Sequence, residues 1–149
     1  MASISRRKLV RPLVAFVIVD ILAVGAGMGV PIFAILLGFA VGWIAPTVLS
    51  APGDEGLAVL RRSLIAACLT AGFTAALMLL IWGPTVRLLF GPARGLANFG
   101  IPMWLYEPRP SFIGWLVLMV IVSPVLQALT TGFAAAVRVA WRPPRIKDE

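Results

Sequence analysis

Hydrophobic residues form long uninterrupted segments along this chain, and charged residues, glycine and proline gather in the short stretches between them. The segment 12–45 contains a single charged residue, Asp20. As one helix it would be about 51 Å long, whereas the hydrocarbon core of a bilayer is roughly 30 Å thick. Flexible glycines precede Pro31, a residue suited to the first turn of a new helix. The pattern therefore predicts a tight hairpin of two helices, residues 12–28 and 31–49.

Two more helices are expected after this hairpin. The polar segment 50–62 leads to a third helix at 63–82, which Gly83 and Pro84 should end, because proline cannot continue the backbone hydrogen-bond ladder. A fourth helix is predicted at 112–137. We expect the connection 84–111 to lie on the outer, non-cytoplasmic face of the membrane. Residues 138–149 are expected to form a basic cytoplasmic tail. The predicted fold class is an all-α integral membrane protein with four transmembrane helices in one domain, residues 1–149.

The amino-acid composition indicates that the folded chain is surrounded mainly by lipid. Of the 149 residues, 60% are hydrophobic and only 13% are charged, and the mean hydropathy is +1.00. Soluble proteins are about 25% charged. The net charge of +7 comes from basic residues that flank the apolar segments and do not form one basic face. We therefore predict the lipid bilayer, and no nucleic acid, as a partner.

The basic residues also predict an orientation, because cytoplasmic loops of membrane proteins are enriched in lysine and arginine. A four-span arrangement with the N-terminus inside places ten basic residues on the cytoplasmic side and three outside, whereas fusing the first two helices gives seven against six. We therefore expect both termini to be cytoplasmic, in a bacterial plasma membrane. The ten are Arg6, Arg7, Lys8, Arg11, Arg61, Arg62, Arg138, Arg142, Arg145 and Lys147.

The residue inventory argues against an enzyme. The chain has no histidine, and Cys68 is its single cysteine, so no protein-ligated haem or iron–sulfur cluster is expected. No catalytic motif or metal-ligand spacing is found, and the sequence identifies no pigment, quinone or other cofactor.

Asp20 is the most informative single residue, because a carboxylate inside a membrane helix costs about 2.5–3.5 kcal/mol and needs a partner or a proton. Ser123, Gln127 and Thr131 recur every four residues in the fourth helix, forming a polar stripe that is a candidate partner for Asp20. Three roles for Asp20 remain open. It is a structural hydrogen-bonding acid, a contact with another subunit or a bound cofactor, or a proton or cation site in a transport path.

Small residues mark the helix faces expected to pack closely, since close backbone approach drives helix association in lipid. Gly38 and Gly42 form a GxxxG pattern, interpreted either as packing within the predicted hairpin or as a seam for another subunit. The third helix has a face of small residues and hydroxyls that includes Thr74. The predicted packing residues are Gly27, Ala34, Gly38, Gly42, Ala67 and Ala71.

The outer connection is long for a loop without a role, so it is a candidate contact surface for a partner or a lipid. Its aromatic residues are suited to the headgroup level and its arginines to phosphates. The predicted contact residues are Arg87, Phe90, Arg94, Trp104, Tyr106 and Arg109.

The expected function is that of a non-enzymatic membrane subunit, or an accessory or assembly protein, of a larger membrane complex. The alternative is a small homo-oligomeric transporter or channel in which Asp20 binds a proton or cation. Expected partners are accordingly other membrane subunits or further copies of this chain.

Overall fold

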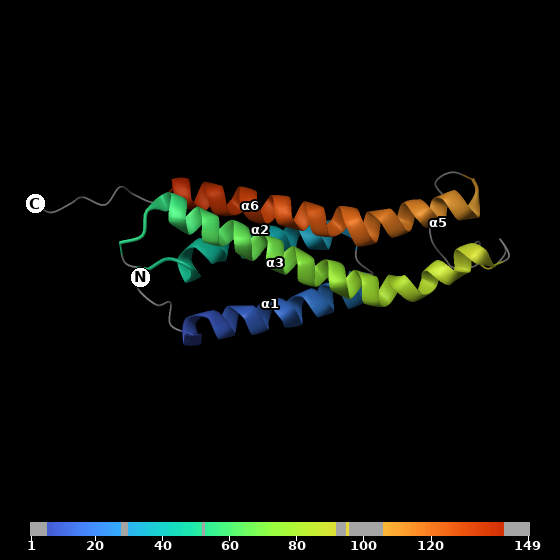
Figure 1. Ribbon diagram of the computed structural model, residues 1–149, viewed down its shortest axis with the longest axis horizontal. Helices are drawn as coiled ribbons and strands as arrows, with labels where there is room; N and C mark the ends of the chain where they lie inside the picture. The colour runs from blue at the N-terminus through green and yellow to red at the C-terminus, as the bar shows by residue number, and fades with distance from the viewer. Residues whose placement is uncertain (1–5, 28–29, 52, 92–94, 96–105, 142–149) are drawn as a thin grey trace, which may run out of the picture.

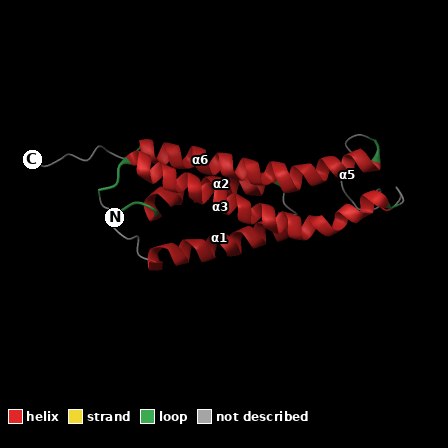
Figure 2. Ribbon diagram, in the orientation of Figure 1, coloured by secondary structure: helices red, strands yellow, loops and turns green. Residues whose placement is uncertain are grey.

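The structure, a computed structural model, describes residues 6–27, 30–51, 53–91, 95 and 106–141. Helices make up almost all of this part of the chain, and no strand occurs in it (Figure 2). The all-helical class predicted from the sequence is therefore confirmed.

The first two helices are α1 (Arg6–Gly27) and α2 (Pro31–Val48). The predicted start of α1 at residue 12 is wrong, because the helix begins six residues earlier and continues through Pro12. α2 begins at Pro31 as predicted, with the proline in the first turn, where its missing N–H has no partner to lose. Residues 28 and 29, in the predicted hairpin turn, lie outside the described part.

The third helix, α3 (Gly56–Trp82), begins seven residues before the predicted start at 63. The charges of segment 50–62 predicted a connection, yet Arg61 and Arg62 lie in the second turn of α3. The predicted end at Trp82 is correct. Beyond it the chain stays helical as the 3₁₀ segment η1 (Gly83–Phe90), which had been assigned to the outer connection.

The last helical segment consists of α5 (Pro108–Val117), the π-helical turn η2 (Leu118–Val122) and α6 (Ser123–Ala140). It extends the predicted 112–137 helix at both ends. The π turn ends two residues before Pro124, whose ring nitrogen cannot donate a hydrogen bond. A wider turn at this point is consistent with that missing donor, and π turns recur at functional sites.

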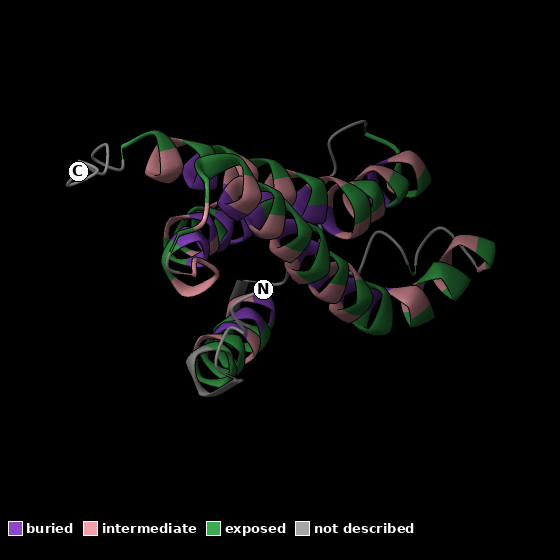
Figure 3. Ribbon diagram, turned by 60° about the vertical axis from the view of Figure 1, so that its left-hand side comes forward, coloured by how far each residue is buried: buried purple, intermediate pink, exposed green. Residues whose placement is uncertain are grey.

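Successive helices run in alternating directions, so α1 and α3 begin at the end of the bundle where α2 and α6 finish (Figure 1). α6 packs most extensively on α2 and also along α3. α1 lies on the opposite side from α6 and has much lighter contact with α2 and α3 (Figures 1 and 3). The bundle therefore has a tightly packed three-helix part and a more peripheral α1.

Large apolar side chains cover the outside of this bundle. Leu69, Leu80 and Leu129 are examples, with Leu69 70% exposed. Within the described residues, three helical segments are long and apolar enough to cross a membrane: Pro31–Val48, Gly56–Phe90 and Pro108–Ala140. Such an outer surface is consistent with an integral membrane protein. α1 is not among the three, so a fourth span remains a prediction.

Candidate functional site

Asp20 joins α1 to α3. Its side chain is only 1% exposed, and its Oδ2 lies 2.8 Å from Oγ1 of Thr74. The same Thr74 oxygen lies 3.1 Å from the carbonyl oxygen of Thr70. A hydroxyl has one proton to donate, so Thr74 can donate to the carboxylate or to the carbonyl. A protonated Asp20 would donate to Thr74 and leave the Thr74 proton for Thr70, which satisfies all three groups.

The polar stripe of α6 is buried but does not bind Asp20. Ser123 donates to the carbonyl of Leu118 at 2.9 Å, and Thr131 donates to the carbonyl of Gln127 at 2.7 Å. The amide nitrogen and oxygen of Gln127 have no hydrogen-bond partner among the described residues. The predicted pairing of Asp20 with the α6 stripe is therefore wrong. Asp20 hydrogen-bonds to Thr74 of α3, and the stripe hydroxyls donate to carbonyls of their own helical segment.

The GxxxG glycines mark a close approach of two helices. A Cβ placed on Gly38 would lie 2.5 Å from the carbonyl oxygen of Gln127, and one on Gly42 would meet the carbonyl oxygen of Thr131. Both neighbours belong to α6, so the contact is within the chain but not within the predicted hairpin of α1 and α2. Only a residue without a side chain fits here at this helix separation.

The other predicted packing residues lie along the same interior. Ala34 of α2 is buried, and Ala67 and Ala71 of α3 are buried in one row with Thr74. Gly27 is the last residue of α1, and nothing is described of its surroundings. Small residues therefore line the interior faces of α2 and α3, as their spacing on these helices requires.

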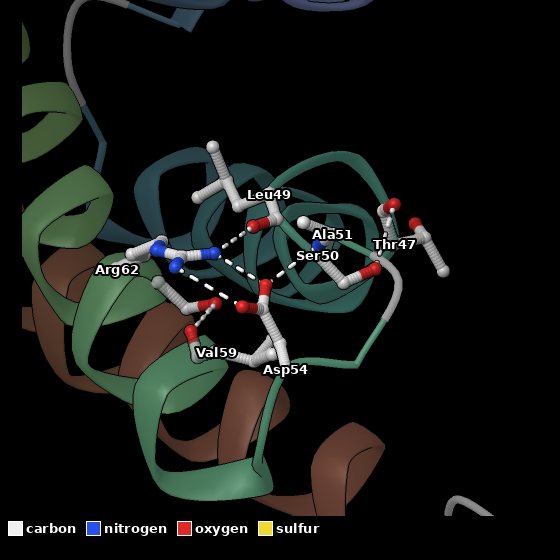
Figure 4. Close-up of polar contacts among 8 residues, drawn as sticks. Thr47, Leu49, Ser50, Ala51, Asp54, Val59 and Arg62 are labelled. Carbon is white, nitrogen blue, oxygen red and sulfur yellow. Dashed lines mark hydrogen bonds and ion pairs between the residues drawn. The ribbon is translucent and has the colours of Figure 1, made fainter. Parts of the chain in front are cut away.

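A second polar cluster lies at the end where α3 begins. The Arg62 guanidinium forms an ion pair with Asp54 through two nitrogens, and its Nη1 also donates to the carbonyl of Leu49 at 3.0 Å (Figure 4). Asp54 additionally accepts the backbone N–H of Ala51 at 2.6 Å. These bonds connect the end of α2 to the start of α3. The sequence analysis had used Arg62 only as an orientation signal.

Two aromatic residues and an arginine meet at the same end. The Arg138 guanidinium lies 5.1 Å from the ring centre of Trp43, and Trp141 packs edge-on against that ring with centres 6.1 Å apart. This arrangement joins the end of α6 to α2 and is suited to a headgroup region, where one side of an aromatic ring is apolar and the other is wet.

An apolar groove lies between α1, α2 and α3 on the side away from α6. Its volume is about 510 Å³. Hydrophobic side chains such as Phe16, Ile44 and Leu69 form nearly all of its wall, and the polar exceptions are Arg62 and Thr70. The groove was not predicted from the sequence, because helical spacing shows which residues share a face but not how far apart two helices lie.

The far end of the bundle carries those predicted contact residues that the structure describes. Arg87 and Phe90 belong to η1 and Arg109 to α5, where Arg109 donates to the carbonyl of Gly91 at 3.3 Å. Phe90 and Tyr106 are among the most exposed residues described. Arg94 and Trp104 lie outside the described residues.

The described residues contain no group of three or more His, Cys, Asp or Glu side chains that would hold a metal ion. Comparisons with protein-family models, with curated proteins and with solved structures find no match to this chain.

Proposed function

We propose that the protein is a non-enzymatic integral membrane subunit, or an accessory protein, of a larger membrane complex, and that it contacts its partner through the end formed by η1 and α5. One observation carries the proposal. Phe90 is 86% exposed and Tyr106 is 95% exposed at this end, next to Arg87 and Arg109. Aromatic residues and arginine are the types most enriched at the centres of protein interfaces.

The backbone of Tyr106 supports the same proposal. Its φ of 56° lies in the left-handed region, which residues other than glycine seldom occupy. Backbone strain of this kind costs of order 1–3 kcal/mol and clusters at binding sites and ligand clamps. Here it fixes the direction in which a fully exposed aromatic ring leaves the chain.

For the orientation we propose that the opposite end, and with it both termini, faces the cytoplasm of a bacterial cell. The beginnings of α1 and α3 and the end of α6 lie together there (Figure 1). These segments contain Arg11, Arg61, Arg62 and Arg138, whereas η1 and α5 contain only Arg87 and Arg109. This distribution follows the positive-inside rule.

In this proposal Asp20 is a structural residue. It provides a hydrogen bond between peripheral α1 and the rest of the bundle, and the groove beside it is almost wholly apolar. The alternative, a homo-oligomeric transporter with Asp20 as its proton or cation site, is favoured by Gln127. The buried amide of this residue lacks a hydrogen-bond partner within the described part, and such groups are often satisfied by water or an ion.

The test is photo-crosslinking in intact cells with p-benzoylphenylalanine at position 90 or 106. Leu57 is the matched control site, because it is also highly exposed but lies at the opposite end of α3. We expect a discrete adduct with a different protein from positions 90 and 106 and none from 57. Adducts only with a second copy of this chain, or no adduct from 90 and 106, would overturn the proposal. If adducts form only with a second copy of this chain, the transporter alternative is tested by comparing proton flux in proteoliposomes between the unaltered protein and Asp20→Asn.

A further inference from the structure

We propose that the groove between α1, α2 and α3 is a binding site for one acyl chain of an anionic phospholipid, with the lipid phosphate at Arg62. The groove lies away from the η1 and α5 end, so this site is independent of the proposed function. Its volume of about 510 Å³ falls in the range of roughly 300–1,000 Å³ that is typical of small-molecule pockets.

The shape and lining of the groove suit a hydrocarbon chain. Its lining runs along three helices, from Leu9 to Val19 on α1, from Leu37 to Leu49 on α2 and from Arg62 to Thr70 on α3. At 1.5 Å per residue these stretches are about 12–18 Å long. The lining is almost wholly apolar side chains. A chain that lies parallel to the helices would therefore fill the groove with van der Waals contacts without leaving a polar group unbonded.

The polar end of the groove determines which headgroup fits. A guanidinium has five N–H donors, and the bonds of Arg62 to Leu49 and Asp54 account for three of them. The Arg62 side chain is 37% exposed, and we propose that a phosphate reaches its remaining donors from this side. Arginine binds phosphate through such paired donors.

The surrounding charge favours an anionic lipid over a zwitterionic one. Arg11 and Arg61 lie in the second turns of α1 and α3, and Arg138 lies in the last turn of α6. These helix ends lie together at the end of the bundle where α3 begins (Figure 1). Asp54 neutralises part of this charge through its ion pair with Arg62. The proposal therefore predicts opposite effects for the two members of this pair. Removing the arginine charge weakens the preference for an anionic lipid, and removing the aspartate charge strengthens it.

The first experiment is native mass spectrometry of the detergent-purified full chain, titrated with dioleoyl phosphatidylglycerol or dioleoyl phosphatidylcholine. We expect one bound phosphatidylglycerol, held about tenfold more tightly than phosphatidylcholine, because both lipids offer the same phosphate but the choline cation of the second is repelled by the arginines at this end. Arg62→Gln should bring the two affinities together, and Asp54→Asn should widen the difference. Equal affinities in the unaltered protein, or the same change from both variants, would overturn the proposal.

The location of the bound lipid is tested with a matched pair of tryptophan substitutions on α3. Ala66 lines the groove, whereas Ala76 is exposed and lies outside it. Ala66→Trp should abolish tight binding of phosphatidylglycerol, and Ala76→Trp should leave it unchanged. The same loss from both variants, or unchanged binding by Ala66→Trp, would contradict the site.

A further measurement needs no variant and so does not depend on folding. Phosphatidylglycerol with a diazirine in its acyl chain is photolysed on the unaltered protein, and the adducts are mapped by peptide mass spectrometry. Adducts should concentrate on groove residues such as Ile44, Ile65 and Leu69. An even spread that includes Leu80 and Leu129, which are exposed on other surfaces, would overturn the proposal, as would photolysis without adducts in the groove.

Discussion

Gly42→Ala tests the close contact between α2 and α6. The new Cβ would lie 2.2 Å from the carbonyl oxygen of Thr131 and 2.8 Å from Cβ of Ala134, whereas ordinary contact begins at 3.4 Å. α2 and α6 would have to separate by about 1.2 Å at this point to restore contact with the carbonyl. The obstacle is backbone, so a rotamer change cannot relieve it. Overpacking of this kind costs about 1–3 kcal/mol, which is a 5- to 150-fold change in the unfolding equilibrium.

The assay is reversible unfolding in mixed micelles with a rising fraction of sodium dodecyl sulfate, followed by circular dichroism. Gly72→Ala is the control, because a Cβ on Gly72 meets nothing within 4 Å. A glycine-to-alanine change in an open helical position should be neutral or stabilising by about 0.4–1 kcal/mol. Gly42→Ala should unfold at a clearly lower detergent fraction. If both variants unfold together, the proposed close contact of α2 with α6 is refuted.

Three further predictions use the same molecule. Thr74→Val should lower the free energy of unfolding by about 0.5–1.5 kcal/mol in the same detergent titration, because it removes the hydrogen bond to Asp20. Asp20→Asn keeps an oxygen acceptor and should lower it by less, so the reverse order would contradict a structural Asp20. Arg62→Lys loses the two-nitrogen contact with Asp54 but should lower the free energy of unfolding by at most about 1 kcal/mol, because the ion pair is partly exposed. Added salt should reduce this difference between the variant and the unaltered protein. A difference that salt does not change would count against the ion pair as its cause. Cys68 is exposed on α3, which is long and apolar enough to cross a membrane, so a charged maleimide should label it only after detergent is added. Rapid labelling in sealed vesicles would place it in water.

The sequence predicted the helices where the local signal was strong. Pro31 marks the start of α2 because its ring suits a first helical turn, and Gly83 with Pro84 ends the α-helical part of the third segment. The early start of α3 was missed because Arg61 and Arg62 resemble residues of a polar loop. Arginine is compatible with a helix end, since its long side chain can extend toward the headgroups while the backbone stays helical.

The partners of the site residues were harder to predict than the residues themselves. Spacing places Asp20, Gln127 and Gly38 on helix faces, but it does not decide which helix each face meets. In the structure Asp20 hydrogen-bonds to Thr74 and Gly38 packs against α6, and neither contact follows from chain order. The hydroxyls on the small-residue face of α3 were the available signal for a partner of Asp20.

The unequal lengths of the helices have a consequence for the surrounding lipid. α2 has 18 residues, about 27 Å, whereas α3 alone has 27, about 40 Å, and continues into η1. The segment from α5 to α6 is of similar length to α3 with η1, and the shorter α1 lies on the opposite side of the bundle. A bilayer of uniform thickness cannot match both sides, and each ångström of hydrophobic mismatch costs a fraction of a kcal/mol. The protein should therefore tilt or deform the bilayer around it, and its distribution should depend on local membrane thickness.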